Sequence, residues 1–143
     1  MEEKILNLLL VEDDEVDVMN VKRALKKNNL RNPLYVACNG IEALKMLRGE
    51  NESSLNIPKQ RRIILLDLNM PRMSGLEFLE ELRADSELKS IPVIVLTTSD
   101  EDRDRIEAYN LNVAGYLLKP VNFSQFIETM ATLNKYWMLC EMP

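Results

Sequence analysis

The sequence contains no histidine among its 143 residues. This absence excludes catalysis by a Ser-His-Asp or Cys-His arrangement, a zinc site of the H-E-x-x-H type, and an imidazole base that works near neutral pH. Several common classes of enzyme are thereby ruled out before any motif is considered.

Cysteine is scarce as well. Cys38 and Cys140 are the only two, and they lack the C-x-x-C spacing that is typical of redox and metal sites. We therefore expect two reduced thiols and a cytoplasmic protein. Glu2 and Glu3 favour the same location, because a secretion signal would carry positive charge at its start.

Long apolar runs and an excess of positive charge are also missing. No stretch approaches the roughly 18 apolar residues that a membrane span requires, so we expect no membrane partner. The net charge is −5, and phosphate backbones are bound by clustered Lys and Arg, so we expect no nucleic-acid partner. The one basic cluster, residues 59–62, is interpreted as a solvated loop ahead of a buried strand.

The composition that remains is that of a globular domain, with 46% hydrophobic and 29% charged residues. A chain of this length typically forms one domain that buries about two-thirds of its unfolded surface. We expect a single domain over residues 1–143, with a core of about 5–135 and an apolar extension over 136–143.

Near-continuous apolar runs at residues 5–11, 63–66 and 93–96 predict strands buried on both faces of a parallel sheet. Shorter strands are predicted at 34–37 and 115–118. Between the strands, apolar residues recur at spacings of three and four, which predicts helices; they are Val18, Val21 and Leu25, then Leu44 and Leu47, then Phe78 and Leu82. The alternation predicts an α/β fold with right-handed crossovers and helices on both sheet faces.

Capping residues mark where helices begin. Ser74 precedes Glu77 by three residues and Asn122 precedes Gln125 by three, and such pairs satisfy free backbone amides of a first helical turn. Asn39-Gly40 predicts a turn ahead of the second helix. Residues 49–62 are polar and aperiodic, and we interpret them as an inserted surface loop.

Side chains that bind ions or react follow four of the predicted strands. Glu12 and Asp13 follow the first, Asp67 the third, Thr97 closes the fourth and Lys119 follows the fifth. The carboxyl ends of parallel strands meet at one edge of a sheet, where open α/β folds bind ligands. A single Asp or Glu at a strand end is more often a turn residue or a helix cap than a functional group, and the signal here is the succession of four such strand ends.

Three neighbouring carboxylates are stable at neutral pH only if a cation or protons offset their charge. Hard oxygen ligands suit Mg²⁺, so the cluster predicts a magnesium site. A carboxylate can also act as a nucleophile and form an aspartyl phosphate, with a metal and a lysine neutralising the phosphoryl oxygens.

Five segments resemble, in order and spacing, the receiver domain of bacterial two-component response regulators. They read LVEDD at 10–14, LLDLNMP at 65–71, MSG at 73–75, LTT at 96–98 and LKP at 118–120. The resemblance runs from about residue 5 through the last predicted helix. It implies a flavodoxin-like, doubly wound (βα)5 fold whose five-stranded parallel sheet has the order 2-1-3-4-5.

The resemblance also implies the chemistry of the acidic residues. Asp67 is then the phosphoacceptor, which takes a phosphoryl group from a sensor histidine kinase with Mg²⁺. Asp13 is a direct magnesium ligand, Glu12 acts through water, and Asn69 offers its backbone carbonyl.

Three further positions receive roles from the same resemblance. Thr97 matches a switch hydroxyl, Lys119 a phosphate-binding lysine, and Tyr116 an aromatic residue that moves inward on activation. The alternative for Tyr116 is an amphipathic strand residue with its hydroxyl in water.

The predicted last helix and the residues after it suggest the output. Because the chain ends soon after that helix, we expect output by a protein contact instead of a second, DNA-binding domain. The helix has a core-facing stripe, made by Phe123, Phe126, Met130, Leu133 and Trp137. The dense apolar ending beyond it predicts a contact surface and a homodimer. This ending and the long loop resemble single-domain regulators that partner phytochrome-type sensor kinases.

Two other classes of function remain open. A phosphohydrolase of the haloacid dehalogenase kind also uses a nucleophilic Asp, but it usually needs a second Asp two residues later, where this chain has Asn69. A receiver-like interaction module that takes no phosphate is the other alternative. We expect a protein that phosphorylates itself from a donor and slowly hydrolyses that group, and not an enzyme for an outside substrate.

Overall fold

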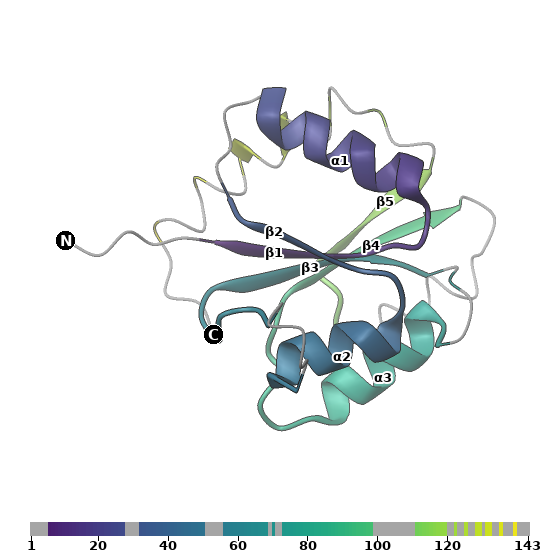
Figure 1. Ribbon diagram of the computed structural model, residues 1–143, viewed down its shortest axis with the longest axis vertical. Coiled ribbons are helices and arrows are strands. Elements are labelled where there is room, and N and C mark those ends of the chain that lie inside the picture. The colour runs from purple at the N-terminus through teal and green to yellow at the C-terminus, as the bar shows by residue number, and fades with distance from the viewer. Residues whose placement is uncertain are drawn as a thin grey trace.

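The structure is a computed structural model in which the described residues are 6–27, 32–50, 56–68, 70, 73–98, 111–119, 122, 125, 128, 129, 131, 132, 135 and 139. Along these residues the strands and helices follow in the order β1 (Asn7–Val11), α1 (Glu15–Lys27), β2 (Leu34–Ala37), α2 (Gly40–Arg48), β3 (Arg62–Asp67), α3 (Gly75–Ala84), β4 (Val93–Thr98) and β5 (Gly115–Lys119). Helix α1 covers one face of the sheet, and α2 and α3 cover the other (Figure 1). Among the described residues, no helix combines the length and apolar character needed to cross a membrane.

The five strands form one parallel sheet in the order β2-β1-β3-β4-β5, which confirms the predicted flavodoxin-like topology. Pairing begins in β1 at Asn7, opposite Arg62, so this strand starts two residues later than predicted. Val11 pairs with Leu66, and Thr98 pairs with Lys119. This register brings the carboxyl ends of the central strands to the same edge.

Two hydrophobic layers lie on the two faces of the sheet, as the uninterrupted apolar runs predict. Along β3, Ile63 and Leu65 pack in the layer that contains α1 residues Val21 and Leu25. Their neighbours, Ile64 and Leu66, pack in the layer of α2 and α3. This second layer includes the helical residues that the spacing pattern predicted, namely Leu44, Leu47, Phe78 and Leu82.

The two predicted capping residues, Ser74 and Asn122, accept the expected hydrogen bonds, and Asn39, predicted as part of a turn, is also a helix cap. The Asn39 side chain accepts a hydrogen bond from the Glu42 amide (2.8 Å), and Ser74 Oγ accepts one from the Glu77 amide (3.2 Å). Asn122 Oδ1 accepts one from the Gln125 amide (3.2 Å). Residues 125, 128, 129, 131, 132 and 135 are helical, while the five residues of the predicted apolar stripe lie outside the described residues.

The segment before β3 is partly buried, which corrects its interpretation as a solvated surface loop. Ile57 is 3% exposed, and its amide donates to the Met46 carbonyl (3.3 Å). Arg61 and Arg62 are 9% and 6% exposed, whereas the preceding Lys59 is exposed. The polar composition conceals this burial, because the segment packs on the end of α2.

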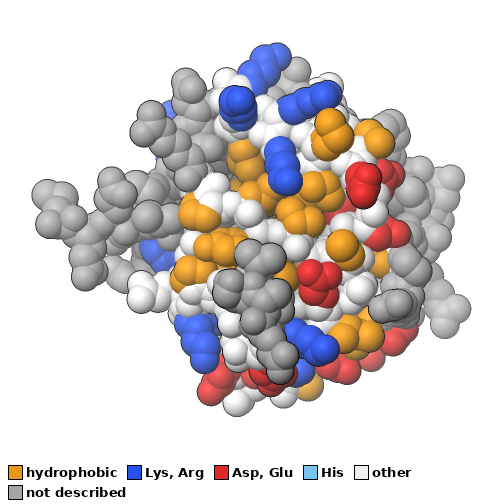
Figure 2. All heavy atoms as spheres, in the orientation of Figure 1, with side chains coloured by type: hydrophobic (Ala, Val, Ile, Leu, Met, Phe, Trp, Pro, Cys, Tyr) orange, Lys and Arg blue, Asp and Glu red, His pale blue; other side chains and the backbone are white. Residues whose placement is uncertain are grey.

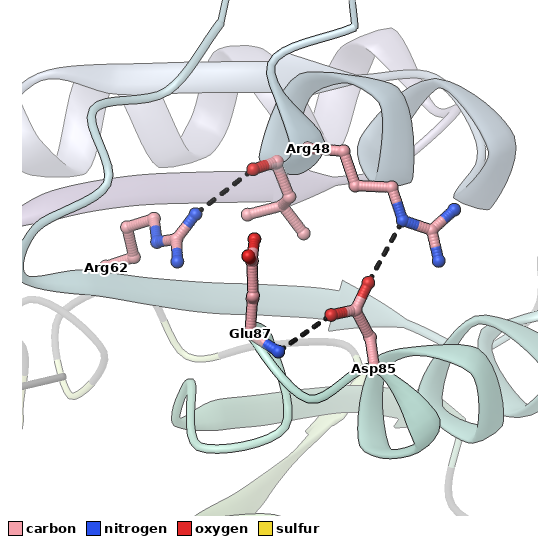
Figure 3. Close-up of polar contacts among 5 residues, drawn as sticks. Arg48, Arg62, Asp85 and Glu87 are labelled. Carbon is pink, nitrogen blue, oxygen red and sulfur yellow. Dashed lines mark hydrogen bonds and ion pairs between the residues drawn. The ribbon is translucent and has the colours of Figure 1, made fainter.

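Arg62 is buried because it serves the last turn of α2. Its Nη1 donates to the carbonyl of Leu47 (3.2 Å; Figure 3), one of the acceptors that a helix end leaves without an internal donor. A cation is also favourable at the negative end of the helix dipole. Burial lowers the pKa of Arg62, and the charges of Asp85 and Glu87 oppose that shift.

Candidate functional site

Three carboxylates meet where β1 and β3 end. Glu12, Asp13 and Asp67 each offer an oxygen atom, and these atoms lie within 4.8 Å of one another. The Glu12 and Asp67 residues are 1% and 3% exposed, whereas Asp13 is exposed to solvent. The structure thus brings together the three acids that the strand ends singled out, in a cluster that is open on the side of Asp13.

The turn after β1 holds its acids through backbone hydrogen bonds. The Glu12 amide donates to the Ala37 carbonyl of β2 (3.0 Å), and Glu12 Oε1 accepts from the amide of Asp14 (3.2 Å). Asp14 Oδ1 in turn accepts from the Val16 amide (2.8 Å), so Asp14 caps the start of α1. The sequence interpretation missed this role, although an Asp just before an amphipathic helix is a recognised start signal.

The end of β3 is held equally closely. The Leu68 amide donates to the Leu96 carbonyl (3.1 Å), and the Gly75 amide donates to the Leu68 carbonyl (3.1 Å). A Cβ atom on Gly75 would lie 2.6 Å from the Leu68 Cα and 2.8 Å from the carbonyl oxygen of Asp67. Only glycine permits this approach of α3 to the strand end.

Negative charge extends beyond the three clustered acids. Figure 2 shows acidic side chains gathered on the side of the molecule where the strands end. Cys38 follows β2 at this edge, and its thiol lies close enough to these carboxylates to be affected by their negative charge. Partial burial raises the pKa of its thiol, and the carboxylate of Glu42, followed by those of Asp13 and Glu15, raises it further. Cys38 is a free thiol, as expected, and Cys140 lies outside the described residues.

A divalent cation matches this arrangement. Carboxylates less than 5 Å apart repel one another, and positive charge between them removes that penalty. All the donors in the cluster are hard oxygen atoms, the type preferred by Mg²⁺ and Mn²⁺. Among the described residues, Glu12, Asp13 and Asp67 form a group able to hold such an ion, and Asn69 lies outside that part of the chain.

The backbone brings two further predicted site residues to this edge. Asp67 pairs with Leu96, so Thr97 follows at the next position of β4, and Lys119 ends β5 opposite Thr98. The side chains of Thr97 and Lys119 are not among the described parts of the chain. Tyr116 is half-buried and packs against the hydrophobic layer of α2 and α3.

Comparisons with known proteins agree with this geometry. Residues 8–131 match the response regulator receiver domain. Response regulator Rcp1 of Synechocystis sp. is 36% identical over 131 residues, which are 92% of this chain and 88% of Rcp1.

Two solved structures are also similar. The phosphorylated cyanobacterial phytochrome response regulator RcpA is 33% identical with a TM-score of 0.79, over 97% of this chain and 99% of RcpA. The Mn²⁺-bound form of Rcp1 is 34% identical with a TM-score of 0.77, over 96% of this chain and 99% of that structure. The chain therefore belongs to the family of response regulator receiver domains.

Proposed function

We propose that this chain is a stand-alone receiver of a two-component system, in which Asp67 accepts a phosphoryl group from a sensor histidine kinase. The observation that carries the proposal is the buried Asp67 carboxylate, which shares a cluster with Glu12 and Asp13 at the carboxyl edge of the sheet. Residues 1–143 then form one receiver domain, with its core at about 5–135 and an apolar extension over 136–143.

Magnesium is the proposed cofactor. Glu12, Asp13 and Asp67 would hold it, and Asn69 would add its backbone carbonyl. The carboxylate donor set supports this assignment, and a Mn²⁺-bound form is known for the similar protein Rcp1. When bound, the ion supplies positive charge that offsets both the carboxylates and the phosphoryl oxygens.

Phosphoryl transfer needs a nucleophile and a means of neutralising charge. A carboxylate oxygen of Asp67 attacks the phosphorus, the bond from phosphorus to the donor breaks, and its electron pair leaves with the kinase imidazole. Lys119 offers an ammonium group and Thr97 a hydroxyl to the transferred oxygens. Attack by water on the phosphorus later returns Asp67 and inorganic phosphate, so the protein turns over no outside substrate.

Thr97 and Tyr116 are the proposed switch. Phosphorylation places charge and acceptor oxygens at Asp67, and a Thr97 hydroxyl that moves toward them leaves a space that the Tyr116 ring can fill. The half-buried position of Tyr116 against the core supports this role, because its ring lies between the hydrophobic layer and solvent.

The proposed partners are a phytochrome-type sensor kinase and a second copy of this chain. The first rests on similarity to RcpA, which is a phytochrome response regulator. The second rests on the apolar ending, of which the described residue Leu139 is 85% exposed. Nucleic acid and membrane are not proposed as partners, and the proposed location is the cytoplasm.

Two alternatives lead to different outcomes of one experiment. An interaction module without phosphorylation would leave the carboxylate cluster unused. A haloacid dehalogenase-like phosphohydrolase would need a general acid at residue 69, where Asn69 stands. The match of residues 8–131 to receiver domains favours neither alternative.

The test is incubation with Mg²⁺ and acetyl phosphate, followed by intact mass measurement and gel filtration. We expect one phosphoryl adduct on the wild-type protein and none on Asp67→Asn.

Asp14→Asn is the matched control, because it removes a neighbouring charge but keeps a good helix cap, and it should take up the phosphoryl group. An adduct on Asp67→Asn would refute the assignment of Asp67. An unmodified wild type would favour the inert module, and release of phosphate from added esters would favour the hydrolase.

A further inference from the structure

Arg83, in the last turn of α3, donates hydrogen bonds to four backbone carbonyls. Its Nε contacts Leu111 O (2.7 Å), and its Nη2 contacts Asn112 O (3.0 Å). Its Nη1 contacts both Lys89 O (2.7 Å) and Ile91 O (2.8 Å). One guanidinium therefore joins two connections that lie far apart in the sequence.

These two connections lead into neighbouring strands. Lys89 and Ile91 belong to the segment that enters β4, and residues 111 and 112 belong to the segment that enters β5. Asn112 has a φ of 62°, a conformation that few residues adopt readily, so this entry has a defined and unusual shape. Arg83 thus links the segments that enter the two strands through hydrogen bonds to both.

Strand β5 is held in the sheet on one side only, by its parallel pairing with β4 from Gly115 to Lys119. In the described sheet β5 is an edge strand that pairs with β4 alone, and its approach is marked by one bond from the Ala114 amide to the Val93 carbonyl (2.7 Å). A slip of one residue between paired strands exchanges the two faces of a strand. In β5 such a slip would turn Tyr116 to the opposite face of the sheet and shift Lys119 along the strand axis, toward or away from the edge that carries the carboxylates.

Arginine is suited to this task, and lysine is not. The guanidinium carries five N–H donors in a rigid planar fork, whereas the lysine ammonium is a point charge on a flexible stem. Desolvation of the half-buried side chain lowers the pKa of Arg83. The four carbonyls provide the hydrogen bonds that make burial of this charge tolerable.

We propose that Arg83 is a positioning residue: from the sheet edge opposite the carboxylates, it sets the register of β5 on β4 and thereby places Lys119 for phosphoryl transfer to Asp67. The part that concerns Lys119 rests on the proposed function. The part that concerns β5 does not.

The kinetic test measures the rate at which acetyl phosphate and Mg²⁺ modify Asp67, by intact mass. Misplacement of a reacting group by about 1 Å costs up to about 100-fold, so we expect Arg83→Met to slow the reaction by roughly tenfold or more. Lys119→Met should also slow it, and adding Arg83→Met to Lys119→Met should have little further effect, because both changes remove one interaction. Effects that multiply in the double variant would overturn the proposal.

Arg48→Met is the matched control. Arg48 is an arginine at the end of α2, and it makes one partly exposed ion pair with Asp85 (3.2 Å; Figure 3). We expect its phosphorylation rate to match that of the wild type. A rate as low as that of Arg83→Met would show that loss of any arginine at this edge has the same effect, and would refute the proposal.

Hydrogen exchange tests the position of β5 without phosphorylation. We expect Arg83→Met to accelerate exchange of the amides in residues 115–119 more than exchange in β1 and β3, and Arg48→Met to accelerate neither. Arg83→Lys should show the same pattern at smaller amplitude, which covers the case in which Arg83→Met does not fold. Unchanged exchange in β5 would refute the positioning role. If the wild type takes up no phosphoryl group while Arg83→Met shows the predicted faster exchange in β5, only the proposed function is refuted.

Discussion

Gly75 lies so close to Asp67 that a Cβ atom on the glycine would sit 2.8 Å from the Asp67 carbonyl oxygen. The same atom would lie 2.6 Å from the Cα of Leu68. Both neighbours are backbone atoms, which cannot turn aside as the end of a flexible side chain can. The start of α3 and the end of β3 therefore behave as one packed unit around the proposed phosphoacceptor.

Gly75→Ala should consequently disturb both stability and the site. We expect the free energy of unfolding to fall by about 1–3 kcal/mol, as for other overpacked positions, and phosphorylation by acetyl phosphate to slow because Asp67 must shift. Urea denaturation and intact mass measure the two effects. Gly115→Ala is the control for stability, since a Cβ there meets nothing within 4 Å. Equal stability of the two variants would contradict the close packing.

Asp13→Asn should have opposite effects on two properties of the acidic cluster, the stability of the metal-free protein and the binding of Mg²⁺. Removing one of three mutually repelling carboxylates should raise the free energy of unfolding in metal-free buffer by about 1 kcal/mol. The same change should weaken Mg²⁺ binding by about tenfold or more, so the rise in Tm on adding Mg²⁺ should shrink. Thermal denaturation with and without Mg²⁺ measures both effects.

The control for this variant is Asp14→Asn, which removes an adjacent exposed charge from outside the cluster. It should keep most of the Mg²⁺-dependent gain in Tm. If Asp13→Asn lowers stability without metal, or retains the full gain with Mg²⁺, the cluster does not act as a cation site.

Asp85 predicts a dependence of stability on pH. Its pKa lies below the ordinary value of 3.8, chiefly because the Glu87 amide donates to Oδ1 (2.8 Å) and also because Arg48 donates to Oδ2 (3.2 Å). Because the pKa of this group is lower in the folded than in the unfolded protein, it stabilises the fold fully at any pH above its unfolded-state pKa. This stabilisation is lost as the pH falls through its folded-state pKa. Asp85→Asn should therefore be less stable than the wild type at neutral pH, and the difference should vanish in strong acid.

Urea denaturation at a series of pH values measures this difference. Glu81→Gln, a change of an exposed acid in α3, the helix that ends just before Asp85, should differ little from the wild type at any pH. A difference between Asp85→Asn and the wild type that stays constant down to strong acid would show that the carboxylate charge contributes nothing.

Much of the site was predictable because its residues stand at strand ends. Residues 63–66 form an unbroken apolar run, so burial on both faces, a parallel sheet and the position of Asp67 at its edge follow from one pattern. The strand order came from the resemblance to receiver domains, since local patterns do not state which strands are neighbours. The cap at Ser74 was predictable because its partner is three residues away, whereas Asn39 was predicted as a turn and its capping of Glu42 came from the structure.

Other features depend on groups that local patterns do not contain. The burial of Ile57 and Arg62 follows from the free carbonyls at the end of α2, and the role of Arg83 follows from two loops that meet only in the folded chain. An arginine or a single apolar residue within a polar segment belongs to no periodic pattern. The polar composition of residues 49–62 therefore led to the prediction of a solvated loop.

The sequence by itself therefore determined the alternation of strands and helices, the parallel sheet and the acids at its carboxyl edge, because periodicity and strand ends are local properties. The tertiary structure alone decided how closely Glu12, Asp13 and Asp67 approach, why only glycine fits at residue 75, and which carbonyls Arg83 joins. Those are contacts between distant segments, and packing in three dimensions sets their distances.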